Sequence, residues 1–274
     1  MLEKFTYINN LGEKIYFGKD YLFVNENDLR DFAWEISTKN NKISGFKKGI
    51  VSKTIPIIIN CGSEDKGIKI RNELFEVFEK DVLAKKHGRI QIGDYYLQCY
   101  ITGSKKSQYL VHKSLMVVSL IVQTDLTEWV KETTTTATMN SEGVSRYLDY
   151  PHDFSHDYKN QLISATVRNN NLAESNFIMT IFGEVMNPTF FIGQHKYAVN
   201  VTVGVDEKLV IDSKNKTIKL IDANDKQFNC FNNRDKGSYV FEKIPTGDNK
   251  ITSTNPHFHF SLTLLEERSE PKWT

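Results

Sequence analysis

The 274-residue sequence has no excess charge of either sign and few cysteines, and each shortage excludes a class of protein. Lys and Arg total 35 against 34 for Asp and Glu, leaving a formal net charge of +1. Nucleic-acid binders draw much of their affinity from unbalanced basic charge, so we expect no sequence-specific nucleic-acid partner. The three cysteines, an odd number without a CxxC pair, are Cys61, Cys99 and Cys230. We expect Cys61 and Cys99 to be buried thiols rather than metal ligands.

Long apolar segments are also missing. The longest apolar run, from Leu115 to Val122, is interrupted by Ser119 and is far shorter than the ~20 residues of a transmembrane helix. The N-terminal residues lead into a patterned segment at Phe5 without the apolar core of a signal peptide. We therefore expect a protein that is synthesised soluble in the cytoplasm of its host and has no membrane partner.

Motifs that carry catalysis or bind cofactors are absent as well. The sequence contains no GxxxxGKS/T or GxGxxG phosphate loop, no GxSxG nucleophile elbow and no HExxH metal motif.

His257 and His259 lie on one face of a predicted strand and could ligate zinc, but no third ligand has a matching spacing. We expect both to face solvent. A polar cluster that could hold a divalent ion contains His152, Asp153, His156 and Asp157. We assign no metal-binding, cofactor-binding or catalytic residue.

Carboxylates and aromatic residues in the C-terminal half raise two further possibilities. Glycoside hydrolysis needs two carboxylates at a fixed separation, whereas most of these lie in predicted turns, where they are simply solvated: Glu174, Glu184, Asp206, Glu207, Asp212, Asp222 and Asp225. Four aromatic residues could stack on sugars but also fit strand patterns that pack into a core: Phe190, Phe191, Tyr197 and Tyr239. We predict that the protein is not an enzyme.

Short strand patterns are what the sequence has in abundance. Hydrophobic residues make up 39% of the chain, enough to build cores without disulfides or metals. The segments Thr217–Leu220 and His257–Leu264 alternate polar and apolar residues, as strands with one buried face do. Polar turns recur about every ten residues, which is the spacing of an antiparallel β-sandwich. We predict a mainly β protein of two domains, with a C-terminal β-sandwich over residues 161–274.

The first 130 residues predict a β-rich domain with one helix. Strands are expected at residues 5–8, 14–17, 32–36 and 54–59, with a polar loop over 37–43 and a long strand within 105–122. Pro56 cannot donate to a ladder, so its strand should begin there or lie at an edge.

The helix should begin near Ser63, because Ser63, Glu64 and Asp65 can cap and charge its N-terminus. Gly88 is expected to end it. The apolar residues at helical spacing are Ile70, Leu74, Phe75, Phe78 and Val82. Such a lone helix either covers a sheet face or lines an interface.

Residues 131–160 change in character and predict a linker or exposed arm between the domains. They include four consecutive threonines, Thr133–Thr136, and turn-forming segments such as Asn140–Gly143 and Tyr150–Asp153.

Several segments of the C-terminal half resemble the siphophage tail protein family, whose best-known members are the distal tail (Dit) proteins. The resemblance is carried by the motifs Glu174–Gly183, Leu209–Thr217, Phe231–Lys236, Phe241–Gly247 and Glu266–Trp273, in that order. Shorter matches are Asn187-Pro188 and Ile192-Gly193. The N-terminal half agrees in its strand–helix–strand course and in the turn Ile92–Tyr96. The segment Tyr150–His156 departs from the family pattern and leaves the path of the arm open.

The resemblance implies a structural protein of the virion, in the baseplate or tail tip of a phage. It implies that residues 1–130 form a ring, usually a hexamer, from which a galectin-like C-terminal domain projects. One face of the ring would meet the major tail (tube) protein and the other the tail-associated lysin or tip protein, leaving a channel for DNA. The near-zero net charge suits close packing of identical copies. The alternative is a carbohydrate-binding module that attaches to the host cell wall. Host-wall carbohydrate and a receptor-binding protein are further expected partners. Fold alone does not confer sugar binding.

Overall fold

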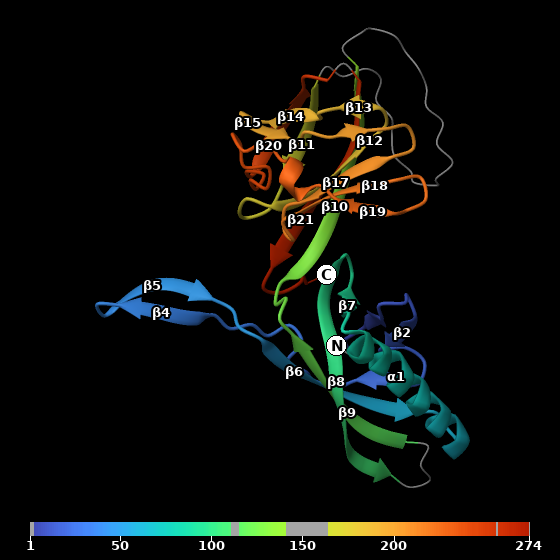
Figure 1. The fold of residues 1–274 in the computed structure, drawn as a ribbon. Helices are drawn as coiled ribbons and strands as arrows, with labels where there is room; N and C mark the ends of the chain where they lie inside the picture. The colour runs from blue at the N-terminus through green and yellow to red at the C-terminus, as the bar shows by residue number, and fades with distance from the viewer. Residues whose placement is uncertain (1–2, 111–114, 141–163, 256, 274) are drawn as a thin grey trace. The chain divides into compact units, whose positions relative to one another are not determined.

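The structure is a computed structural model that describes residues 3–110, 115–140, 164–255 and 257–273. Within these ranges the chain is mainly β, as predicted, with one α-helix, α1 (Glu64–Ala84), and one 3-10 turn, η1 (Phe231–Asn233). It forms two compact units (Figure 1): unit 1 is Met1–Lys131 with Glu267–Thr274, and unit 2 is Glu132–Glu266. Each unit has its own hydrophobic core. Residues 267–274, which we expected in the C-terminal domain, group with unit 1.

Unit 1 contains two sheets that share the long strand β8 (Tyr95–Leu110). One sheet runs in the order β10–β8–β7–β1–β2, with bounds Trp129–Asn140, Tyr95–Leu110, Gly88–Ile92, Phe5–Ile8 and Lys14–Phe17. The other runs β8–β9–β6–β3, in which β9 is Leu115–Thr124, β6 is Val51–Asn60 and β3 is Leu22–Val24. The long strand expected within 105–122 is therefore the end of β8 and most of β9.

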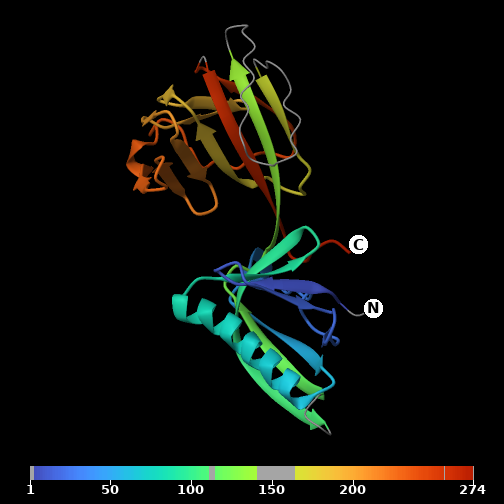
Figure 2. The same cartoon turned by 90° about the vertical axis from the view of Figure 1, so that its right-hand side faces the viewer.

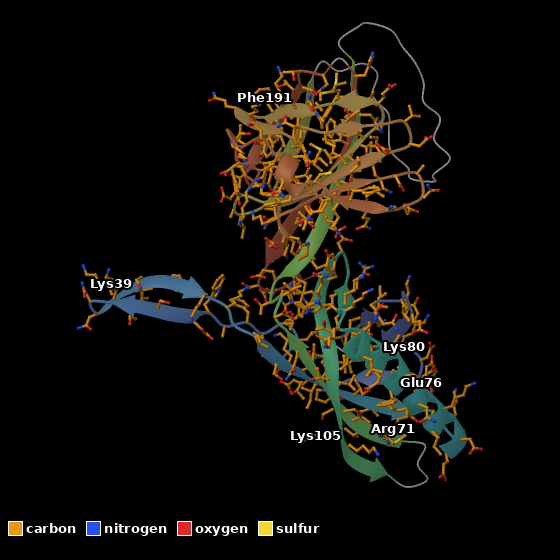
Figure 3. All side chains as sticks on the ribbon, in the orientation of Figure 1. Lys39, Arg71, Glu76, Lys80, Lys105 and Phe191 are labelled. Carbon is orange, nitrogen blue, oxygen red and sulfur yellow. The ribbon has the colours of Figure 1, made fainter. Side chains whose placement is uncertain are left out.

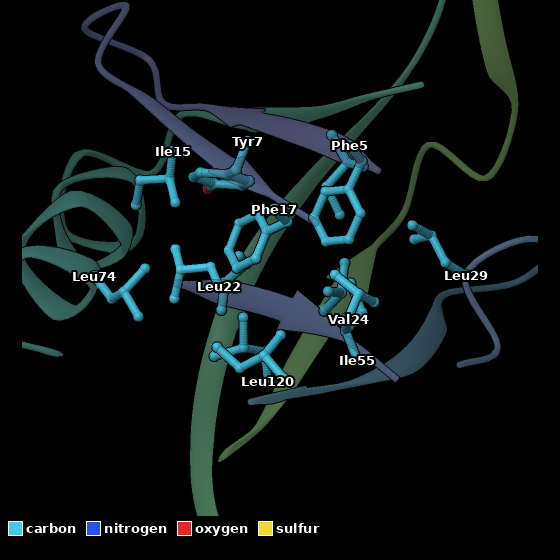
Figure 4. Packing of buried hydrophobic residues seen from close by; sticks show 14 of the residues in the cluster. Phe5, Tyr7, Ile15, Phe17, Leu22, Val24, Leu29, Ile55, Leu74 and Leu120 are labelled. Carbon is cyan, nitrogen blue, oxygen red and sulfur yellow. The ribbon is translucent and has the colours of Figure 1, made fainter. Parts of the chain in front are cut away.

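Alternation along these strands places one row of side chains in the core of unit 1. In β6 the buried positions are Lys53, Ile55, Ile57 and Ile59. Figure 4 shows the β1 and β2 aromatics facing the β6 and β9 residues, and the rings of Phe5 and Phe17 stack with centroids 4.6 Å apart. Cys99 is buried in this core, as predicted, whereas Cys61 is only partly buried at its margin.

Helix α1 lies along one face of unit 1 (Figure 2) and buries Ile70, Leu74, Val77 and Phe78 against the strands. The prediction of the helix is confirmed, but two of its expected core residues, Phe75 and Val82, are exposed. In the described part of the chain no helix combines the length and apolar character that a membrane span requires.

Lys85, not Gly88, ends the helix. Lys85 adopts the left-handed conformation, with φ of 53°, and its backbone N–H bonds to the Val82 carbonyl at 3.2 Å. Gly88 is the first residue of β7, and a glycine is required there for a steric reason. A Cβ there would overlap the Asp81 carboxylate and the Tyr7 hydroxyl.

The Tyr7 hydroxyl and Asp81 form a fully buried polar contact. The hydroxyl donates to Asp81 Oδ2 at 2.5 Å, and the Asn10 backbone N–H donates to Asp81 Oδ1 at 2.8 Å. Burial, and then the bond to Asp81, raise the pKa of Tyr7 above its usual range. The contact ties the end of α1 to β1 and its following turn.

Pro56 lies in the middle of β6 rather than at its start, which excludes the first of the two predicted alternatives. Its position is nevertheless an edge, because β3 ends where Val24 pairs with Ile57. The Pro56 carbonyl accepts from the Asn25 N–H, at 2.9 Å, on the side where β3 has ended. The absence of a backbone N–H at Pro56 therefore removes no hydrogen bond between paired strands.

The polar loop expected at 37–43 is instead a hairpin. Strands β4 (Glu35–Lys39) and β5 (Lys42–Lys47) pair antiparallel across a two-residue turn. Both turn residues, Asn40 and Asn41, have positive φ, at 50° and 57°. Asparagine tolerates this conformation well, and two such residues in a row suit the tight turns that fit twisted hairpins.

The four threonines also belong to a strand. They lie in β10, so residues 131–140 of the expected linker are strand. β-branched threonine favours strands, and the Thr134 hydroxyl lies 2.8 Å from that of Thr263 on the neighbouring strand. The remainder of the expected linker, 141–160, lies outside the described residues.

Unit 2 is built from two antiparallel sheets and a two-stranded pair, β13–β16 (Val185–Met186 and Thr202–Val203). The larger sheet runs β19–β18–β17–β12–β21–β10, with new bounds Gln227–Asn229, Thr217–Ile221, Lys208–Asp212, Asn176–Phe182 and His257–Arg268. The smaller runs β11–β20–β14–β15, with bounds Ser164–Asn169, Gly247–Ser253, Thr189–Ile192 and His195–Ala198. The predicted alternation in β21 is confirmed, since its buried residues include Phe258, Phe260, Leu262 and Leu264.

Polar side chains close the turns of unit 2. Asp212 Oδ1 accepts from the Asn215 N–H at 2.9 Å, and Asp222 Oδ1 accepts from the Asn224 N–H at 2.9 Å. The Arg234 guanidinium lies 3.9 Å from the Phe231 ring centroid, and its Nη1 donates to the Phe231 carbonyl at 2.7 Å. The polar motifs of this region therefore hold turns and strand ends together.

Gly88→Ala tests the close approach at the end of α1. We expect it to lower the unfolding free energy of unit 1 by roughly 2–4 kcal/mol, because the added methyl overpacks the site and disturbs a buried hydrogen bond. Urea unfolding followed by tryptophan fluorescence measures this loss. Gly45→Ala is the matched control, since its Cβ would meet nothing nearer than Ser37 Cβ at 4.0 Å. Equal midpoints for the two variants would contradict the steric explanation.

Candidate assembly surfaces

The β4–β5 hairpin, which we name the arm (Glu35–Lys47), projects from the body of unit 1 (Figure 1) and is exposed along almost its whole length. Ile36 pairs with Phe46 and Thr38 with Ile43, and a bulge adds one residue to β5 between Phe46 and Ile43, so these side chains share one face of the ribbon. Trp34, just before β4, continues this face, and its ring meets that of Phe46 edge-on at 6.4 Å. The arm thus has an apolar face, defined by Trp34, Ile36, Ile43 and Phe46.

The opposite face of the arm is charged and mostly basic. It carries Glu35, Lys39, Lys42 and Lys47, and Figure 3 labels Lys39 at the tip. Glu35 and Lys47 form an exposed ion pair at 3.4 Å, which contributes little to stability.

The arm has no further strand or helix against it among the described residues. A two-stranded ribbon is at best marginally stable in water without a covering layer. Phe46 is 61% exposed and Ile43 59%. An exposed apolar face of this kind, with two unpaired strand edges, marks an interaction surface.

The base of the arm is held firmly. Lys53 Nζ donates to the Asp28 carbonyl at 2.9 Å and also to that of Asp31. Burial lowers the pKa of Lys53. Lys48 Nζ donates to Ser269 Oγ at 3.0 Å and lies 4.5 Å from the Trp34 ring centroid.

The segment 267–273 packs beside this base. The Arg30 guanidinium lies 4.1 Å from the Trp273 ring centroid, and Arg30 Nη1 donates to the Pro271 carbonyl at 3.2 Å. Arg30 Nε also pairs with Glu3 at 2.5 Å. Contacts from both ends of the chain therefore fix the residues from which the arm extends.

A second exposed apolar surface runs along α1. Ile68, Phe75 and Val82 recur every seven residues on the side of the helix that faces away from the core, and Leu83 adjoins them. We name these four residues the α1 stripe. Phe75 is 62% exposed and Leu83 75%. The sequence pattern places Phe75 and Val82 at the spacing expected of core residues. It does not show that Val77 and Asp81 take their place on the core side of α1.

A groove of about 340 Å³ opens beside this stripe. Its helical wall includes Arg71, Phe75 and Glu79, and its floor includes Gly103 of β8 and Val118 of β9. Glu76 and Arg71 are labelled along α1 in Figure 3. The exposed side of α1 also carries the carboxylates of Asp65, Glu76 and, half-buried, Glu79.

The two histidines of β21, His257 and His259, differ in their surroundings. Among the residues placed, no group of three or more His, Cys, Asp or Glu side chains lies close enough to hold a metal ion. His257 is exposed as expected, but the solvent-facing prediction is wrong for His259. Its Nδ1 lies 2.5 Å from Thr138 Oγ1, its ring packs on Phe182, and burial lowers its pKa. The cluster of His152, Asp153, His156 and Asp157 lies outside the described residues.

Two of the four candidate sugar-stacking aromatics belong to the core of unit 2. Phe190 and Tyr197 are buried and stack with centroids 5.0 Å apart, and the Tyr197 hydroxyl donates to the Glu242 carbonyl at 2.9 Å. Phe191 is half-buried, whereas Tyr239 is exposed. The candidate carboxylates Asp212, Asp222 and Glu207 accept bonds from turn N–H groups, as solvated turn residues do.

The comparisons with solved structures match the whole chain. The crystal structure of SPP1 Dit, described as a paradigm of the hub adsorption apparatus in phages that infect Gram-positive bacteria, superposes with a TM-score of 0.61 at 11% identity, covering 97% of this chain and 98% of that one. A chain of the phage P2 baseplate in its activated conformation with Ca gives 0.62 at 10% identity, covering 99% and 100%. The phage p2 baseplate with Sr gives 0.58 at 11% identity, covering 95% and 97%.

The chain therefore has the fold of phage distal tail and baseplate hub proteins. No family model and no curated protein sequence matches it.

Replacing His259 tests its burial against β10. A histidine with a lowered folded pKa binds fewer protons than in the unfolded chain, so stability falls as pH drops below the ordinary value of about 6.5. We expect His259→Gln to remove part of this loss between about pH 7 and 5, and His257→Gln, at the exposed position, to retain it. Far-UV circular dichroism is the readout, because all three tryptophans lie in unit 1. Identical pH profiles for the two variants would contradict the assignment.

Proposed function

We propose that this chain is a structural protein of a phage tail tip, a distal tail or baseplate hub protein whose copies assemble into a ring. The observation that carries the proposal is the likeness over the full length of the chain to SPP1 Dit and to a baseplate chain, with coverage of 97% or more on both sides. A likeness confined to one β-sandwich would support much less, because sandwiches serve many functions.

In this proposal, unit 1 builds the ring and unit 2 is a galectin-like domain that projects from it. One face of the ring binds the tail tube protein, the other binds the tail-associated lysin or tip protein, and the central channel lets DNA pass. The location is the virion. The protein has a scaffolding role rather than an enzymatic one.

The surface of unit 1 supports assembly. The arm and the α1 stripe expose large apolar side chains that a monomer would leave in water. The formal net charge of +1 adds little repulsion between copies packed side by side. A cyclic ring requires two different complementary patches on each subunit.

The purified chain should therefore form a closed ring, with a mass that is a whole-number multiple of 31.6 kDa. Mass photometry over a dilution series gives the copy number, and negative-stain electron microscopy shows whether the particle is closed around a channel. Tyr239→Ser, at an exposed aromatic of unit 2, is the control and should form the same ring. A monomer that persists at the highest soluble concentration, with no ring in the micrographs, would overturn the proposal.

A further inference from the structure

We propose that the apolar face of the arm in one copy packs onto the α1 stripe of the next copy. This inference rests on the proposed ring, and it names the two patches from which the ring is built. The occupant of the α1 stripe is thus a second copy of this chain.

The distribution of exposed apolar side chains points to these two patches. In the described part of unit 1, most of the large exposed apolar residues fall into two groups. One lies in the arm and its flanks: Phe32, Trp34, Ile36, Ile43, Phe46 and Ile50. The other is the α1 stripe. Leu11, Tyr16 and Trp273 lie outside both groups. Two unlike patches on one subunit are what a heterologous, ring-forming contact requires.

The two patches cannot meet within one copy as the chain is folded. Within unit 1 the arm extends away from the side that carries α1 (Figures 1 and 3). The residues at its base, Lys48 and Lys53, are fixed by partly buried hydrogen bonds that hold it in this direction. Contact between arm and helix therefore needs a neighbour.

The apolar face of the arm is shorter than the α1 stripe and fits within its length. Ile68 to Leu83 spans 15 residues of helix, about 22 Å at the ordinary rise of an α-helix. Trp34 to Thr38 spans four residues of strand, about 13 Å. A ribbon packed on a helix is a common layer arrangement. The groove beside Phe75 can accept an aromatic side chain such as Phe46, and aromatic anchors in pockets are the usual source of binding energy at interfaces.

The charge of the arm favours a partner other than a second arm. Lys39, Lys42 and Lys47 of the arm outnumber its single carboxylate, Glu35. The exposed side of α1 is mixed in charge: it carries Asp65, Glu76 and Glu79 together with Lys69, Arg71 and Lys80. Contact between two arms would bring lysines together, whereas α1 offers carboxylates with which the arm lysines can pair.

Two exposed phenylalanines test the contact separately. In Phe46→Asp the arm is defective and the stripe is intact, and in Phe75→Asp the reverse holds. Each variant should keep its fold, because both side chains are exposed. Each should weaken ring assembly roughly 30-fold or more, the size expected for an interface hot spot. Leu11→Asp, at an exposed apolar residue outside both patches, should assemble like the wild type. Circular dichroism of each variant confirms folding.

Mixing the two variants gives the decisive result. The intact arm of Phe75→Asp can dock on the intact stripe of Phe46→Asp, but the remaining patches cannot bind a third copy. Sedimentation velocity of the mixture should therefore show a dimer that neither variant forms alone. If the wild type forms rings and either variant does too, or the mixture stays monomeric, the arm–helix contact is wrong while the ring stands. A wild type that forms no ring overturns the proposed function itself.

Discussion

An apolar face on a two-stranded ribbon cannot be buried by the ribbon itself, and this constraint shapes unit 1. The arm places Ile36, Ile43 and Phe46 on one face, and in the described part of the chain no further strand or helix covers that face. Each such side chain gains about 1.5–3 kcal/mol when it is fully removed from water. In the proposed assembly, contact with a neighbouring copy removes this surface from water, and that gain offsets part of the cost of association.

The remainder of unit 1 holds the arm and α1 in fixed positions. The base of the arm is pinned by Lys53 to the carbonyls of Asp28 and Asp31 and by Lys48 to Ser269. At the other end of the unit, the buried bond between Tyr7 and Asp81 fixes α1 against β1. Patches held in fixed positions lose little conformational entropy when copies associate. Rigid patches also set a constant angle between neighbours, which is the condition for a ring to close.

Much of the fold follows from local patterns in the sequence, and the errors have identifiable physical causes. Alternation at Phe258 and Phe260 is unambiguous because one face of β21 is buried in its own unit. The sequence pattern predicts a loop where the arm lies, because the arm's strands have no core to face and their polar residues resemble a loop. Asn40-Asn41 after the alternation at Trp34 and Ile36 is the signal that could have predicted it, although the bulge in β5 interrupts the alternation between Ile43 and Phe46.

Helix α1 shows the same limit of prediction from local sequence patterns. Gly88 matches a C-terminal stop in sequence, but its lack of a side chain serves Asp81 and Tyr7, which are distant in the chain. Phe75 and Val82 match a core pattern, yet they lie on the side of α1 that faces outward. Which apolar residues of a helix serve an interface depends on tertiary contacts that local spacing does not contain.

Hydrogen–deuterium exchange of the arm tests the central claim most directly. The protein is labelled at concentrations below and above assembly, and exchange is compared between peptides from residues 34–47, peptides from α1 and peptides from the buried strand β12. We predict that exchange in the arm slows on assembly together with exchange in α1, while β12 is unchanged. Equal exchange in the arm of the monomer and of the assembled particle would contradict the account.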